Sequence, residues 1–346
     1  QAAHDRFKGR VGLHEVIGLC ARQHGFEDTV NGSNIYEALK AAYRGSGVKA
    51  SSGPSIYDIG GILSNTLRKS VKENFMFGEQ VWREVFATTS VKDFKTNTSY
   101  SLTGDMTYRR IAPGGEIKQM TFGETSHENS VDSYGASVGV DRRDLINDDL
   151  NALGGLGKRL GRGGILQIND LVWGTFQANL LKDGTTEFFK TANSNYDAGT
   201  DTVFSNDGLI AAEILWSAMT DPDGKIMGHE AKYCLVPPAL KIPAARMFGS
   251  MKFTANDEEG EMNPWSGRFT PVSSKYLTSS TTAWWLLADP NEMTTLVVSF
   301  LNGRQEPFIE SVDMVPGRLG LFVQAYHDVG ADFQEPRAGF MFKGAA

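Results

Sequence analysis

Apolar positions change their spacing along the chain, and each spacing predicts a different element. Between residues 138 and 182 they recur at steps of three and four, the stripe of an amphipathic helix, and Asp141 and Asp144 supply the acidic residues typical of a helix start. Six glycines interrupt this stripe: Gly154, Gly155, Gly157, Gly161, Gly163 and Gly164. Because each glycine costs up to about 1 kcal/mol in a helix, we expect a short helix over about 142–152, a break, and a long helix over about 156–182. A glycine-rich loop between two ordinary helices is the alternative.

A second pattern predicts a long two-stranded ribbon. Residues 81–94 predict a strand that leads into two arms, residues 98–111 and residues 116–131, and apolar and polar residues alternate in the first arm. Residues 112–115 (APGG) are a strong turn signal between the arms. Roughly forty residues of ribbon with few large apolar side chains are not stable alone in water. We therefore expect the ribbon to project from its own domain and to lie on a partner; two strands of a larger sheet are the alternative.

The remaining segments mix helices and strands without the regular repetition of strand–helix–strand units, which indicates an α+β fold. The first 30 residues predict a poorly packed arm. Helices are predicted at 34–45, at 54–71, from Asp207 onward and after Pro237-Pro238, and strands at 233–236, 283–287, 296–300, 320–326 and 338–342.

Composition narrows the classes of function. The 346 residues suggest about two domains, and the net charge of −7 gives no basic excess for neutralising phosphates, although an acidic protein can surround nucleic acid without adhering to it. Cys20 and Cys234 are too far apart to form a redox or metal motif. No apolar run reaches the roughly 18 residues that a membrane span needs. Because the chain starts at Gln1, we expect either a removed tag or a maturation cut.

Motifs for catalysis are nearly absent. Residues 135–139 match G-x-S-x-G, and Ser137 with His229 and His327 completes a triad on paper, but the elbow needs a buried apolar strand before it and the preceding residues are polar. A small-residue strand is the alternative. In the glycine cluster, Arg159 stands where a phosphate loop needs serine or threonine. The acidic pair Asp148-Asp149 lacks the spacing of a calcium loop. We therefore expect no catalytic residue, no cofactor and no bound metal.

Three segments occur in a familiar order: residues 91–95 (VKDFK), 114–118 (GGEIK) and 141–150 (DRRDLINDDL). In this order they resemble major capsid proteins of tailed bacteriophages, and most closely the Mu-like major head subunit group, which includes members made fused to a maturation protease. The similarity is clearest over about 91–182 and continues weakly to the end of the chain, whereas residues 1–50 match nothing in the family.

The resemblance implies the α+β Hong Kong 97 capsid fold. It would consist of an N-terminal arm (1–70), an E-loop hairpin (95–137), a peripheral domain with a long spine helix (71–94, 138–189 and 306–346) and an axial domain (190–305). The glycine cluster at the start of the spine leads us to expect a helix that bends in a precursor shell and straightens when the shell expands.

The resemblance also implies the function. The chain would be the major head protein of a tailed phage, assembled in the host cytoplasm into pentamers and hexamers of an icosahedral shell around double-stranded DNA. Its partners would be further copies of itself, a portal, and decoration or scaffolding proteins, with packaged DNA held by non-specific proximity and no membrane. The expected interface, at the hairpin tip and the spine start, comprises Pro113, Gly114, Gly115, Glu116, Arg142, Arg143, Asp148 and Asp149. Two alternatives are an encapsulin-like nanocompartment shell and a serine hydrolase that uses Ser137.

Overall fold

The computed structural model describes most of the chain after residue 70. The described residues are 21–22, 26, 37–38, 71–75, 78–103, 108, 110–111, 113–114, 116–117, 123–141, 150–221, 224–253, 261–312 and 320–344. They belong to two compact units: a smaller one of 1–78, 133–166 and 305–327, and a larger one of 79–132, 167–304 and 328–346. The expected N-terminal arm and the helices at 34–45 and 54–71 lie almost entirely outside the described residues.

The larger unit contains a five-stranded sheet in the order β5-β14-β10-β6-β9. Its strands are β5 (Tyr196–Asp197), β14 (Gly339–Phe342), β10 (Trp284–Ala288), β6 (Ala231–Val236) and β9 (Thr270–Ser273). The central strand β10 is buried at all five positions, as expected of an unbroken apolar run covered on both faces. It runs antiparallel to β14 and to β6, while β9 and β5 pair in parallel at the two edges.

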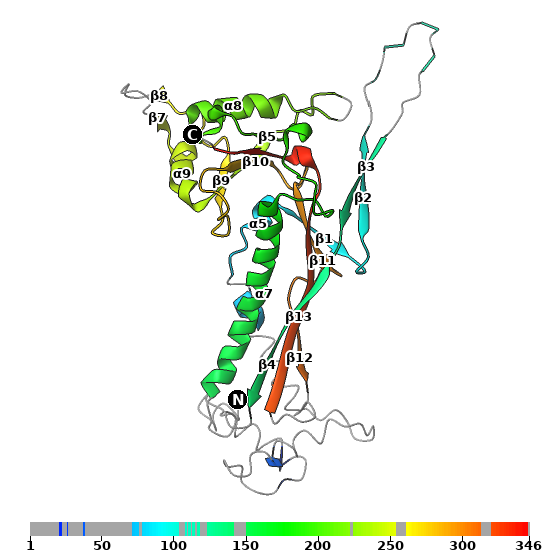
Figure 1. Ribbon diagram of the computed structural model, residues 1–346, viewed down its shortest axis with the longest axis vertical. Helices are drawn as coiled ribbons and strands as arrows, with labels where there is room; N and C mark the ends of the chain where they lie inside the picture. The colour runs from blue at the N-terminus through cyan, green and yellow to red at the C-terminus, as the bar shows by residue number, and fades with distance from the viewer. Residues whose placement is uncertain are drawn as a thin grey trace. The chain divides into compact units, whose positions relative to one another are not determined.

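Two helices pack beside this sheet, α8 (Asn206–Ser217) and α9 (Lys241–Gly249) (Figure 1). Ser205 caps α8, since its hydroxyl accepts a hydrogen bond from the Gly208 amide. Trp216 of α8, Phe248 of α9 and Trp284 of β10 share one hydrophobic core. Short elements complete the unit: η1 (Thr191–Asn193), η2 (Thr200–Thr202), η3 (Pro238–Leu240), η4 (Pro336–Ala338), β7 (Lys252–Phe253) and β8 (Glu261–Met262).

The predicted strand at 81–94 is wrong in its first half. Residues Trp82–Val85 form a helical turn, α5, and only β1 (Ala87–Val91) is extended. The reason is spacing: Trp82 and Val85 are both buried, and a spacing of three places both on one side of a helical turn. β1 pairs in parallel with β11 (Leu296–Leu301), which in turn runs antiparallel to the second part of β13 (Gly320–Phe333).

The helix expected to break at the glycines is continuous. α7 spans Leu150–Ala178 and contains all six glycines of the cluster. A Cβ on Gly161 would lie 2.5 Å from the Val71 carbonyl oxygen, so the absence of a side chain lets the two backbones pack closely. This packing offsets the low helix propensity of glycine. The helix ends at Ala178, four residues before the predicted Lys182, and the next residue, Asn179, has a φ of 55°, the left-handed conformation typical of the residue that terminates a helix.

The smaller unit joins the first half of α7 to three strands. β12 (Phe308–Val312) runs antiparallel to the first part of β13, and β4 (Asp132–Asp141) also pairs with β13. The core of this unit contains Val71, Leu160, Ile309, Val323 and Ala325. The helical stripe predicted from the sequence therefore faces a sheet.

The second half of α7 belongs to the larger unit. There Phe176 is surrounded by aromatic rings at centroid distances of 5.3–6.3 Å, contributed by Phe86, Trp173, Phe189, Trp285 and Phe333. Edge-to-face and tilted pairs of this kind add about 0.5–1.5 kcal/mol each beyond the burial of their area. This aromatic cluster fixes α7 to the strands of the larger unit.

Candidate assembly interface

The predicted ribbon is a hairpin of two seven-residue strands, β2 (Asn97–Thr103) and β3 (Gly123–Asn129). The strands are antiparallel and pair from Asn97 with Asn129 to Thr103 with Gly123, as a two-stranded sheet of their own. Large apolar side chains of the hairpin face solvent: Tyr100 is 65% exposed, Tyr108 96% and Ile117 78%. Three large exposed apolar side chains on one hairpin make it a candidate for a protein–protein contact.

The described part of the hairpin tip has the predicted turn. Pro113 and Gly114 are turn residues, and Gly114 has a φ of +82°, a conformation that favours glycine. Pro113, Gly114 and Glu116 are exposed. The other predicted interface residues lie outside the described ranges: Gly115, Arg142, Arg143, Asp148 and Asp149. The role of the hairpin tip and the spine start in an interface therefore stays a prediction.

The root of the hairpin is fixed to the larger unit by buried polar contacts. The Asn129 amide donates to the Ser299 hydroxyl at 3.2 Å, and the Ser130 N–H donates to a carboxylate oxygen of Asp332 at 3.0 Å. A Cβ on Gly330 would lie 1.7 Å from the Ser130 carbonyl oxygen, so the two backbones touch there. Burial raises the pKa of Asp332, and the hydrogen bond from Ser130 opposes that rise.

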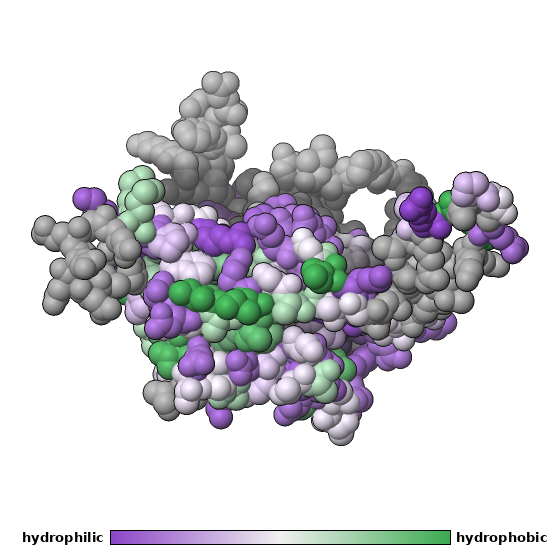
Figure 2. Space-filling view, turned by 90° about the horizontal axis from the view of Figure 1, so that it is seen from above, coloured by the Kyte–Doolittle hydropathy of each residue, from purple (hydrophilic) through white to green (hydrophobic). Residues whose placement is uncertain are grey.

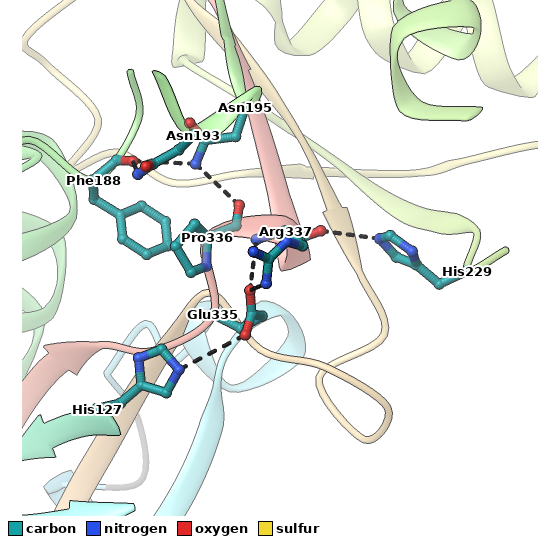
Figure 3. A network of polar contacts seen from close by, with 8 residues as sticks. All are labelled: His127, Phe188, Asn193, Asn195, His229, Glu335, Pro336 and Arg337. Carbon is teal, nitrogen blue, oxygen red and sulfur yellow. Dashed lines mark hydrogen bonds and ion pairs between the residues drawn. The ribbon is translucent and has the colours of Figure 1, made fainter. Parts of the chain in front are cut away.

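Farther from the root, polar side chains hold the flank of the hairpin (Figure 3). His127 of β3 lies 3.7 Å from Glu335, and Ser99 of β2 donates to Gln334 at 3.1 Å. Glu335 is also bound to Arg337 at 2.8 Å. Burial alone would raise the pKa of Glu335, but the neighbouring His127 and Arg337 outweigh it and hold that pKa below its usual value.

The same short segment connects to the rest of the larger unit. His229 is hydrogen-bonded through Nε2 to the Arg337 carbonyl oxygen at 3.0 Å, and the Asn195 amide donates to the carbonyl oxygens of Pro336 and Phe188 (Figure 3). Asn195 is completely buried. These hydrogen bonds tie the segment that supports the hairpin to the loop after α7 and to His229, just before β6.

A second exposed apolar surface lies along one side of helix α8. Ile210 and Ile214 are 46% and 64% exposed, and a spacing of four places them on one side of the helix. Figure 2 shows a strip of apolar atoms on the face that α8 forms. On its inward side α8 contributes Leu209 and Trp216 to the core. The helix is thus apolar on two sides, which ordinary surface helices are not.

The geometry contradicts the serine hydrolase alternative. Ser137 lies inside the ten-residue strand β4, so its backbone is not the sharp strand-to-helix turn that a nucleophile elbow requires. Cys234 is fully buried, which raises the pKa of its thiol and keeps it unreactive. In the described ranges, no group of His, Cys, Asp and Glu has an arrangement that could hold a metal ion. Among the described helices, none combines the length and apolarity needed to cross a membrane.

Sequence reasoning missed the residues that support the hairpin. His127 lies in the polar segment GETSHENS, and Glu335 and Arg337 lie more than 200 residues later. The one signal in the sequence was the polar character of the second hairpin arm, because polar side chains that become buried need hydrogen-bond or ionic partners. Nothing in the spacing identified which residues those partners are.

The solved structures that the chain matches include phage capsids and an encapsulin. The capsid of Myoviridae phage XM1 aligns with a TM-score of 0.50 and 16% identity, over 77% of this chain and 91% of its own. The capsid of cyanophage P-SCSP1u gives 0.49 and 12%, over 76% and 88%, and the SrpI encapsulin complex from Synechococcus elongatus PCC 7942 gives 0.46 and 10%, over 88% and 94%. The XM1 likeness supports the α+β capsid fold of the Hong Kong 97 type.

Comparison of the sequence with protein-family models identifies the family. A comparison with curated proteins found no match. The family model described as phage capsid protein matches residues 124–341, which is more than half of the chain. The matched range includes nearly all of β3, the whole of α7 and all later strands except the last residue of β14. The chain belongs to the phage capsid protein family and is a major capsid protein, a structural subunit of the icosahedral shell of a virion and not an enzyme.

Proposed function

We propose that the subunit builds pentamers and hexamers of its shell by laying the β2–β3 hairpin on a neighbouring copy. The observation that carries this proposal is the exposure of Tyr100, Tyr108 and Ile117 on a hairpin whose strands pair only with each other. A two-stranded ribbon with solvent on both faces is marginal in water. Contact with a second copy supplies the apolar surface that the hairpin lacks.

The energetics favour many modest contacts over one strong contact. Full burial of a large apolar side chain stabilises by about 1.5–3 kcal/mol, so three such residues yield a contact that is useful but reversible. In a closed ring every subunit both gives and receives a hairpin, and the contacts act together. Such an arrangement lets capsomers form correctly before the shell becomes stable.

The finer assignments extend this proposal. Within the family the chain would be of the Mu-like head group, with β2–β3 in the E-loop (95–137) and α7 as the spine of the peripheral domain (71–94, 138–189 and 306–346). Residues 190–305 would form the axial domain and residues 1–70 the arm. A portal and decoration or scaffolding proteins would be further partners, and double-stranded DNA would be enclosed without specific binding, which the net charge of −7 supports. Assembly would occur in the host cytoplasm.

The exposed hairpin residues provide the test. Tyr108→Ser combined with Ile117→Ser removes apolar surface without changing the core, and Ile242→Ser, 61% exposed on α9, is the matched control outside the hairpin. We expect sedimentation velocity to show folded subunits or small oligomers for the hairpin variant and shells for the control. Wild-type shell yield from the hairpin variant would contradict the proposal. Particles that enclose protein cargo and no DNA would favour the nanocompartment alternative.

A further inference from the structure

The contact between His127 and Glu335 is arranged so that its strength depends on the charge of the histidine. Nε2 of His127 lies 3.7 Å from one carboxylate oxygen of Glu335, while Arg337 occupies the other oxygen at 2.8 Å. Both side chains of the His127–Glu335 pair are only 14% exposed. Arg337 therefore orients the carboxylate and leaves one oxygen directed at the hairpin (Figure 3).

A neutral His127 would be poorly satisfied in this position. Nε2 is buried and has no hydrogen-bond partner within range, since 3.7 Å exceeds the usual 2.7–3.2 Å for an N–H···O bond. A charged imidazolium instead gains from the carboxylate at this distance, because Coulomb attraction is longer-ranged and is weakly screened where water is excluded. Histidine is the side chain whose ordinary titration falls between pH 5 and 8.

From this geometry we infer that His127 and Glu335 form a proton-controlled latch, which holds the flank of the hairpin to the larger unit when His127 is charged and releases it when His127 is neutral. This latch is separate from the proposed assembly contact. It would control the mobility of the hairpin within one subunit before a neighbouring copy binds it. The root contacts of Asn129 and Ser130 and the hydrogen bond from Ser99 to Gln334 carry no histidine and would remain in both states, so the latch loosens the β3 edge and does not free the hairpin.

Among the described residues, the other charged groups at the junction are Arg337 on η4, Asp332 on β13, Glu128 on β3, Asp132 at the start of β4 and Lys182 after α7. Burial alone would raise the pKa of Glu335, but His127 and Arg337 more than offset it and hold that pKa below its usual value. The pKa of Asp332 is raised by burial. An Asp332→Asn background therefore removes the titration of Asp332 from the pH response.

Distances between two spin labels on the full chain test the latch. One label replaces Ser126, exposed on β3 beside His127, and the other replaces Asp207, exposed at the start of α8. The background carries Cys20→Ser, while the buried Cys234 is kept because its thiol is shielded. Labelled subunits are diluted into unlabelled ones so that only distances within one subunit are measured by pulsed electron paramagnetic resonance.

We expect a narrow distance distribution at pH 5.5 and a broader or shifted one at pH 8. His127→Gln and Glu335→Gln should give the broad distribution at both values, and His127→Arg, which is always charged, the narrow one at both. The Asp332→Asn background should retain the wild-type response. An unchanged wild-type distribution, a pH response that survives in His127→Gln, or one that disappears in Asp332→Asn would each overturn the latch. The readout does not depend on shell formation, so it is independent of the assembly proposal.

Discussion

At the scale of single residues, the consequence of a glycine depends on what a side chain would meet. Gly161 and Gly163 lie two positions apart in α7, yet a Cβ on Gly161 would press on the Val71 backbone, whereas a Cβ on Gly163 would meet nothing within 4 Å. Helix propensity alone treats these two positions as equal. The difference arises from packing of the smaller unit and not from the sequence pattern.

These two glycines give a matched pair of variants. Gly161→Ala should destabilise the subunit by about 1–3 kcal/mol, because backbone atoms must shift to admit the methyl group. Gly163→Ala should stabilise it by about 0.5–1 kcal/mol through helix propensity. Urea unfolding of dissociated subunits, followed by circular dichroism, measures both. Equal effects of the two substitutions would show that Gly161 is not needed for close packing.

A second prediction at this scale concerns Asp332. Its pKa is raised in the folded state by burial, so the folded state binds a proton more tightly than the unfolded chain does. Stability should therefore fall as pH rises from the ordinary aspartate range through the raised pKa, and stay lower above it. Asp332→Asn, which keeps an acceptor for the Ser130 N–H, should remove this fall. Unfolding midpoints measured from pH 3.5 to 7 provide the check, and a variant with the same slope as wild type would disprove the assignment.

At the scale of elements, the sequence pattern correctly predicted those helices and strands whose positions depend on local burial and capping. The helix capped at Ser205, the strand Ala231–Val236 and the apolar strands β10 and β11 appear within about two residues of their expected positions, because burial and capping fix them. The turn at Pro113 and Gly114 was likewise predicted correctly, from the residue types alone. α5 and the uninterrupted α7 were not, because long-range packing overrides the propensity of each segment.

The aromatic cluster around Phe176 predicts where α7 is most sensitive. Phe176→Ala should cost about 3–5 kcal/mol, since five rings lose a common partner and a cavity remains. Leu166→Ala, on the same helix but 39% exposed, should cost much less and is the control. Denaturant midpoints of the two variants decide the question. A similar small loss for both would mean that the cluster does not fix the helix.

At the scale of the whole molecule, the sequence predicted a long hairpin but did not identify the residues that support it. The few large apolar residues of the ribbon predicted a hairpin that is not stable alone, and Tyr100, Tyr108 and Ile117 are exposed. That the hairpin lies on a partner stays a prediction. The residues that support the hairpin could not be predicted from the sequence, because His127 and Glu335 are more than 200 residues apart in the chain and are brought together by the tertiary fold. Residue spacing carries no information about such contacts.

The central claim is that the hairpin of each subunit is completed by a neighbouring copy. Cryo-electron microscopy of particles assembled from the full chain tests it most directly, at a resolution that traces residues 95–131. The account predicts icosahedral shells in which Tyr108 and Ile117 are buried against an adjacent subunit. Shells in which the hairpin folds back on its own subunit, with these side chains buried there, would contradict it.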